Sequence, residues 1–181
     1  AMLISPYYNK PQQHGLLAHY QKVARGVDIP IVLYNVPGRT AVNILPETAA
    51  QLSAEPNIVA LKEASGNLSQ IEEAIARCNL KVFSGDDAID YPILANGGAG
   101  STSVTSNLLP DLKSQLVHKA LEGDFMGSKA INDMLYPVNK VLFCESNPIP
   151  IKAAMYIAGL IETLEYRLPL LAPSAKNMKR I

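Results

Sequence analysis

The chain has 181 residues, 48% of them hydrophobic, and its 16 basic and 16 acidic side chains give a formal net charge of zero. This composition is too apolar for a disordered chain and is sufficient for one buried core. The neutral charge offers no electrostatic footprint for nucleic acid or an anionic membrane, and no apolar window is long enough to cross a bilayer. We therefore expect a globular protein of the cytoplasm, without nucleic-acid or membrane partners.

Short apolar runs alternate with amphipathic segments through the first two thirds of the chain. We expect strands at residues 1–5, 31–35, 58–62, 81–84 and 101–104. Apolar side chains at helical spacing predict helices at 16–24, 46–52, 67–75, 87–94, 110–121, 124–142 and 152–158, with a last helical piece after Pro173. Asn67 and Asp124 stand where helix N-caps are expected. No strand is expected after Val104.

Alternating strands and helices indicate an α/β fold with a parallel sheet. Two architectures fit, a doubly wound sheet and a (β/α)8 barrel. The glycine-rich stretch at 97–100 precedes a strand instead of opening a helix, so the dinucleotide-binding fingerprint of the doubly wound fold is absent.

A barrel needs eight strands and typically about 250 residues. This sequence supplies the last five βα units, so we expect the first three strands to be missing on the amino-terminal side. The expected domains are a catalytic partial barrel at residues 1–123 and a helical domain at 124–181.

Lys62 ends the third expected strand, and the carboxyl ends of barrel strands are where active sites lie. A lysine partly desolvated by apolar neighbours holds its proton less tightly, and its free amine can attack a carbonyl to give a Schiff base. The alternative is a lysine that marks the strand end and pairs with Glu63. Asp86 and Asp87 could pass for paired catalytic carboxylates, but we favour a helix N-cap.

Neither the cysteines nor the histidines form a metal-binding pattern. Cys78 and Cys144 make no disulfide framework, and we expect both in apolar cores. His14, His19 and His118 are scattered over expected helices. We expect neither a metal nor a cofactor.

Seven short strings, in order along the chain, carry a family resemblance. They are SPYYNKP at 5–11, YNVPGRT at 34–40, LKEASG at 61–66, SGDD at 84–87, GGAG at 97–100, NPIPIK at 147–152 and LPL at 168–170. The set resembles the dihydrodipicolinate synthase and N-acetylneuraminate lyase superfamily of class I aldolase barrels. The variants at 38–40 and 63–66 resemble its synthase branch, and the terminal helices resemble the helical domain that follows the barrel.

The resemblance implies a lyase in which Lys62 condenses with pyruvate. The resulting enamine would attack aspartate semialdehyde to give 4-hydroxy-tetrahydrodipicolinate, in lysine and diaminopimelate biosynthesis. One alternative is another pyruvate-dependent aldolase of the superfamily, an N-acetylneuraminate lyase or a keto-deoxy sugar acid aldolase. Another is a non-catalytic fragment that binds a keto acid. The family's glycine- and threonine-rich loop, which contributes a relay threonine, has no counterpart in this sequence.

The resemblance also implies roles for two tyrosines in catalysis. Tyr34 matches the residue that shuttles protons to and from the Schiff base, which a phenol can do within a hydrogen-bonded relay. Tyr8 matches a relay tyrosine that reaches the active site of a neighbouring subunit. The enzyme would then be a homo-oligomer, at least a dimer and, as is usual in the family, a tetramer built as a dimer of dimers.

Four further residues match binding positions of the family. Arg39 would hold the carboxylate of the aldehyde substrate through paired hydrogen bonds. Gly85 permits close approach of the substrate, and Thr102 stands where the family typically has an isoleucine or valine whose backbone touches pyruvate. Tyr7 matches a position near an allosteric pocket for L-lysine, a feedback inhibitor. For each residue a plain loop or packing role is the alternative.

Overall fold

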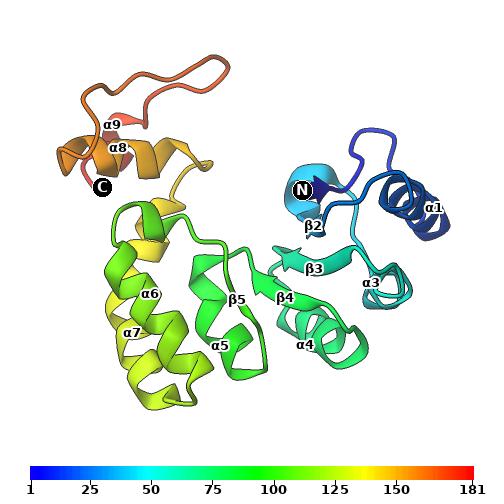
Figure 1. The fold of residues 1–181 in the computed structure, drawn as a ribbon. Coiled ribbons are helices and arrows are strands. Elements are labelled where there is room, and N and C mark those ends of the chain that lie inside the picture. The colour runs from blue at the N-terminus through cyan, green and yellow to red at the C-terminus, as the bar shows by residue number, and fades with distance from the viewer. The chain divides into compact units, whose positions relative to one another are not determined.

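The computed structural model describes residues 1–181, and its first part is built on a five-stranded parallel sheet (Figure 1). The strands are β1 (Met2–Ile4), β2 (Ile31–Asn35), β3 (Ile58–Glu63), β4 (Lys81–Ser84) and β5 (Gly100–Ser101). Their order in the sheet is their order in the chain, and all neighbours are parallel. A doubly wound sheet reverses its strand order at a switch point. The observed order is that of a barrel wall.

The fifth strand is shorter than the sequence predicts and begins one residue earlier. Phe83 and Ser84 of β4 pair with Gly100 and Ser101, and the amide of Thr102 donates to the carbonyl of Ser84. β4 ends there, so residues 103 and 104 have no strand to pair with. The predicted extension of this strand to Val104 is therefore wrong.

Helices connect the strands at the expected places. They are α1 (Gln13–Ala24), α3 (Pro46–Leu52), α4 (Leu68–Arg77) and α5 (Asp90–Ala95), and Asn67 caps α4 by accepting from the amide of Gln70, as predicted. One short element was not expected: Pro37–Thr40 forms a single helical turn, α2, where the sequence predicts a loop. Proline is pre-organised for a first helical position, and the left-handed backbone of Ala41 (φ 56°) ends the turn.

The main core lies between the sheet and the helices α1, α3 and α4 (Figure 1). Leu33 and Leu61, paired across β2 and β3, are almost fully buried there with Leu16 and Tyr20 of α1 and Leu52 of α3. Successive side chains of a strand face opposite sides of the sheet. The residues that follow and precede these leucines, Tyr34 and Lys62 among them, therefore face away from the helices.

Residues 103–181 form a second unit made of helices, with no strand. It contains α6 (Pro110–Leu121), α7 (Phe125–Leu142), α8 (Ile149–Ile157) and α9 (Ala175–Met178). α6 and α7 lie side by side (Figure 1), and Asp124 caps α7 by accepting from the amide of Gly127, as predicted. The compact unit thus begins after Thr102. The functional division expected after Gly123 stays a prediction.

Side-chain bonds fasten the carboxyl-terminal segment within this second unit. Glu145 accepts hydrogen bonds from the amide and hydroxyl of Ser174 and from the side chain of Asn177, and these bonds lower the pKa of its carboxyl. Tyr166 donates to the carbonyl of Ile149. Cys144 is only partly buried, so its expected core position is wrong, whereas Cys78 is buried as expected. None of the helices combines the length and apolar character needed to cross a membrane.

Candidate active site

Lys62 and Tyr34 form the centre of the candidate site. They are paired residues on the neighbouring strands β3 and β2, close to the carboxyl end of each strand. The Nζ atom of Lys62 lies 4.1 Å from the centroid of the Tyr34 ring. At this distance the ring face attracts a cation. The sheet thus brings together two of the three residues for which the sequence predicts a catalytic role.

Burial changes the proton affinity of both groups. It lowers the pKa of the Lys62 amine, and the positive charge of Arg39 lowers it further. It raises the pKa of the Tyr34 hydroxyl, an effect that the charge of Arg39 partly opposes. Lys62 therefore offers more neutral amine at a given pH than an exposed lysine, while Tyr34 keeps its proton and can donate it.

Arg39 owes its place to the short helix α2, which follows β2 directly. This turn keeps the guanidinium near enough to act on the charge states of both Lys62 and Tyr34. A cation beside a lysine disfavours the ammonium form, and it can also attract the carboxylate of a substrate.

Replacing Arg39 with glutamine is expected to raise the pKa of Lys62 without restoring the value of an exposed lysine. The variant removes the smaller cause of the shift and leaves burial, the larger one. Trace acetylation across a pH series, read by peptide mass, should place the midpoint for Lys62 at higher pH than in the wild type. Arg25→Gln, at the amino end of the strands, is the matched control and should leave the midpoint unchanged. A midpoint that moves down in Arg39→Gln contradicts the assignment.

Gly85 lies directly beside the lysine, in the loop after β4. A Cβ atom at this position would lie 2.8 Å from the Cβ of Ala64 and 3.1 Å from the Cε of Lys62. The amide of Gly85 also donates to the carbonyl of Glu63. Because Gly85 has no side chain, the Lys62 side chain can occupy the space beside it.

The structure does not bring the other predicted residues into contact with Lys62. Tyr7 and Tyr8 lie in the loop after β1 and are 67% and 92% exposed, and Tyr8 has a left-handed backbone (φ 66°). Thr102 is exposed at the end of β5, where its amide completes the sheet. Asp86 accepts from the amide of Ala88, as expected of a cap and not of a catalytic pair.

A buried polar group behind the lysine was not expected from the sequence. Glu63 is 1% exposed and hydrogen-bonded to Asn35 and Gln70, so its suggested pairing with Lys62 is wrong. The strand alternation contains the signal, because a lysine on one side of a strand places its neighbour on the other. A carboxylate on the helix-covered side must find hydrogen-bond donors there.

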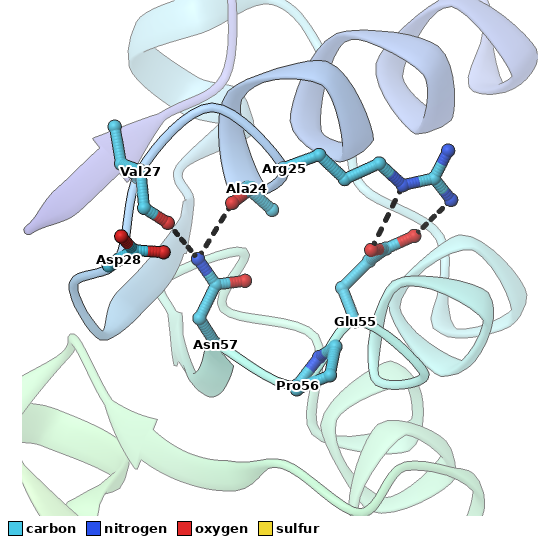
Figure 2. Close-up of a pocket in the computed structure, with 7 residues that line it drawn as sticks. All are labelled: Ala24, Arg25, Val27, Asp28, Glu55, Pro56 and Asn57. Atoms are coloured by element: carbon cyan, nitrogen blue, oxygen red, sulfur yellow. Dashed lines mark hydrogen bonds and ion pairs between the residues drawn. The ribbon is translucent and has the colours of Figure 1, made fainter.

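A separate hollow lies at the opposite ends of the same strands (Figure 2). It is lined by Ala24, Arg25, Val27, Asp28, Glu55, Pro56 and Asn57. The Asn57 amide donates to the carbonyls of Ala24 and Val27, and Arg25 pairs with Glu55 at 2.6 Å. These bonds join the turns that precede β2 and β3. The hollow contains none of the residues around Lys62.

The fold and the site define part of a (β/α)8 barrel with a lysine-centred site at the carboxyl edge of its strands. All 181 residues match the Dihydrodipicolinate synthetase family, and the chain belongs to this family.

Named relatives agree with this assignment. The chain is 67% identical over 181 residues to 4-hydroxy-tetrahydrodipicolinate synthase of Sulfurimonas denitrificans, covering 98% of the chain and 61% of the relative. It resembles the crystal structure of the chloride-inhibited dihydrodipicolinate synthase of Acinetobacter baumannii complexed with pyruvate (40% identity, TM-score 0.95, 99% and 62% of the two chains). It also resembles the Cyanidioschyzon merolae enzyme with lysine bound (37% identity, TM-score 0.93, 99% and 61%). The chain thus spans less than two thirds of these relatives.

Proposed function

We propose that this chain carries the Schiff-base lysine of a 4-hydroxy-tetrahydrodipicolinate synthase, a lyase of lysine and diaminopimelate biosynthesis. The substrates are pyruvate and aspartate semialdehyde. The observation that carries the proposal is the position of the Lys62 amine, 4.1 Å over the Tyr34 ring at the carboxyl edge of the sheet, with a pKa lowered by burial. The family and the names of the relatives support the choice of substrates.

The reaction begins when the neutral Lys62 amine adds to the keto carbon of pyruvate. The former keto oxygen leaves as water, and an iminium forms that withdraws electrons from the methyl carbon. Loss of a methyl proton gives an enamine, which forms a carbon–carbon bond to the aldehyde carbon of the second substrate. The amino group of that substrate then attacks the iminium carbon, closes the ring and releases Lys62.

The neighbouring residues take part in this sequence through proton transfer and binding. Tyr34 is protonated at neutral pH, as any tyrosine is, and its raised pKa makes ionisation harder still, so it can donate to the departing oxygen and recover a proton later. Arg39 holds the carboxylate of aspartate semialdehyde through paired hydrogen bonds. Gly85 leaves room for the substrate carbons attached to Nζ, and the backbone at Thr102 contacts pyruvate.

The exposed tyrosines of the loop after β1 belong to an assembly. The side chain of Tyr8 is almost entirely exposed, so a second copy can receive it. In the proposed enzyme Tyr8 enters the site of a neighbouring subunit, which requires at least a dimer and fits a dimer of dimers. Tyr7, also exposed, would border a site for L-lysine as an inhibitor. The relative with lysine bound supports L-lysine as a ligand.

Trapping with borohydride tests the proposal directly. Protein incubated with pyruvate and borohydride should gain one reduced adduct, mapped by peptide mass to Lys62, and exposed lysines such as Lys81 serve as internal controls. Labelling spread over exposed lysines, or pyruvate binding without an adduct, contradicts the proposal, and the second result would indicate a non-catalytic keto-acid-binding protein. A trapped enzyme that prefers sugar aldehydes over aspartate semialdehyde would instead be another aldolase of the superfamily.

A further inference from the structure

Glu63 is a buried carboxylate at the end of the strand that carries Lys62. It is 1% exposed and lies on the helix-covered side of the sheet, directly after Lys62 in the chain. Burying an ionised carboxylate is costly unless hydrogen bonds replace the lost water. Hydrogen bonds must therefore hold this carboxylate, which is next in the chain to the lysine whose amine is proposed to react.

Hydrogen bonds surround the carboxylate of Glu63. Its Oε1 accepts from the amide of Ser65 at 2.7 Å, and its Oε2 accepts from Nδ2 of Asn35 at 2.9 Å and from Nε2 of Gln70 at 3.3 Å. Each of these partners is a donor, and none is a charged side chain. Such surroundings suit an ionised carboxylate, which only accepts hydrogen bonds.

The donors are themselves held in place. Oδ1 of Asn35 accepts from the amide of Ile44 at 2.9 Å, and its Nδ2 also donates to Oδ1 of Asn43 at 2.8 Å. Asn43 and Gln70 exchange two bonds, at 2.7 and 3.1 Å. The network therefore joins β2, β3, the segment before α3 and the first turn of α4, with Glu63 at its centre.

This network lies behind the candidate site in register with it. Asn35 and Glu63 are paired residues of β2 and β3, as Tyr34 and Lys62 are one step earlier. Backbone bonds add to the connection, since the amide of Ala64 donates to the carbonyl of Asn35. Any slip of one strand end relative to the other would move the Lys62 amine away from the Tyr34 ring.

We infer that Glu63 is a positioning residue for Lys62, and that its bonds to Asn35, Gln70 and Ser65 fix the strand ends that place the amine over Tyr34. The inference rests on the proposed function for its chemical meaning, because Lys62 is there the reacting amine. Glu63 itself touches no substrate and acts through the strand that it anchors.

Glu63→Gln tests the inference. The side-chain amide of the glutamine would point its N–H groups at the donors that bind the carboxylate in the wild type, so some of these hydrogen bonds would be lost. The rate of pyruvate trapping by Lys62 should fall by about tenfold to a hundredfold, since small displacements of a reacting group have effects of this size. The pyruvate concentration for half-maximal rate should change little.

The matched control is Glu55→Gln, the same substitution just before β3, where it breaks the ion pair with Arg25 (Figure 2). The control should reduce stability but not the trapping rate of folded protein. Equal rates in the two variants would overturn the inference.

Trace acetylation of Lys62 across a pH series gives a second readout that needs no pyruvate. In Glu63→Gln the midpoint for Lys62 should move up toward that of an ordinary lysine, because a displaced strand end exposes the amine to water. The double variant Glu63→Gln, Gln70→Glu exchanges the carboxylate and the amide between positions 63 and 70, so the two side chains can again form a hydrogen bond. It should restore part of the trapping rate. An unchanged midpoint together with no rescue would show a purely structural role.

Two further results distinguish a failure to fold and a failure of the proposed function from a failure of the positioning role. If Glu63→Gln does not fold, Gln70→Met removes one donor to the Glu63 carboxylate together with the two bonds to Asn43, and leaves the bonds from Asn35 and Ser65. This variant should shift the Lys62 midpoint in the same direction by less. A wild-type protein whose Lys62 has a low midpoint but traps no pyruvate contradicts the proposed function. The positioning role would then be judged by the acetylation midpoints alone.

Discussion

Replacing Lys62 with methionine is expected to abolish the pyruvate adduct completely and to raise the unfolding temperature. Methionine keeps an unbranched apolar side chain but has no amine to attack a carbonyl. Stability should rise because burial lowers the pKa of Lys62 in the folded chain. The folded state therefore holds the lysine proton less tightly than the unfolded chain does, which is a cost of carrying the ammonium in this site.

The pH dependence of the stability gain identifies its cause. The unfavourable effect of the ammonium is fully present below the folded pKa of Lys62 and vanishes above the unfolded value of about 10.4. The difference in unfolding temperature between variant and wild type should follow this course. The matched control is Lys81→Met, which removes an exposed lysine of the adjacent strand β4. A variant at position 62 that is less stable than the wild type at neutral pH contradicts the interpretation.

Replacing Gly85 with alanine is expected to slow the trapping of pyruvate strongly without abolishing it, and to destabilise the protein. The added methyl group would lie 2.8 Å from the Cβ of Ala64 and 3.1 Å from the Cε of Lys62, so either the loop or the lysine must move. Overpacking of this kind costs about 1–3 kcal/mol of stability. A displaced amine should slow pyruvate trapping by about a hundredfold.

Two variants separate this steric effect from a general loss of glycine. Gly38→Ala is the control, because a Cβ there has no atom within 4 Å, and its trapping rate should stay near that of the wild type. Adding Ala64→Gly to Gly85→Ala removes the closest clash and should recover part of the lost rate. If Gly38→Ala and Gly85→Ala trap pyruvate equally well, the close approach at Gly85 has no role.

Most of the fold could be predicted because its signals are local. The predicted strands at 31–35 and 81–84 agree residue for residue with β2 and β4, and the predicted helix at 46–52 agrees with α3. These segments are short apolar runs or proline-initiated helices with clear ends. The fifth strand was predicted too long because its length depends on where β4 ends, which is a property of the partner strand.

The part of the candidate site that depends on strand alternation and strand order could be predicted from the sequence. Lys62 and Tyr34 lie near the carboxyl ends of neighbouring strands of a parallel sheet, so their contact follows from the order of the strands. The polar network around Glu63 was not predictable, because Asn43 and Gln70 come to it from segments far apart in the sequence. The roles proposed for Tyr7 and Tyr8 could not be tested against a single chain, in which both side chains are exposed.

The order of the strands in the sheet also determines how many hydrogen-bonded neighbours each strand has. β1 and β5 have a paired strand on one side only, whereas β2, β3 and β4 are bonded on both sides. Within residues 1–181, amide protons of the three inner strands should therefore exchange with solvent more slowly than those of β1 and β5. Lys62 lies on the middle strand. The amine of Lys62 is thus carried by the most slowly exchanging part of this sheet.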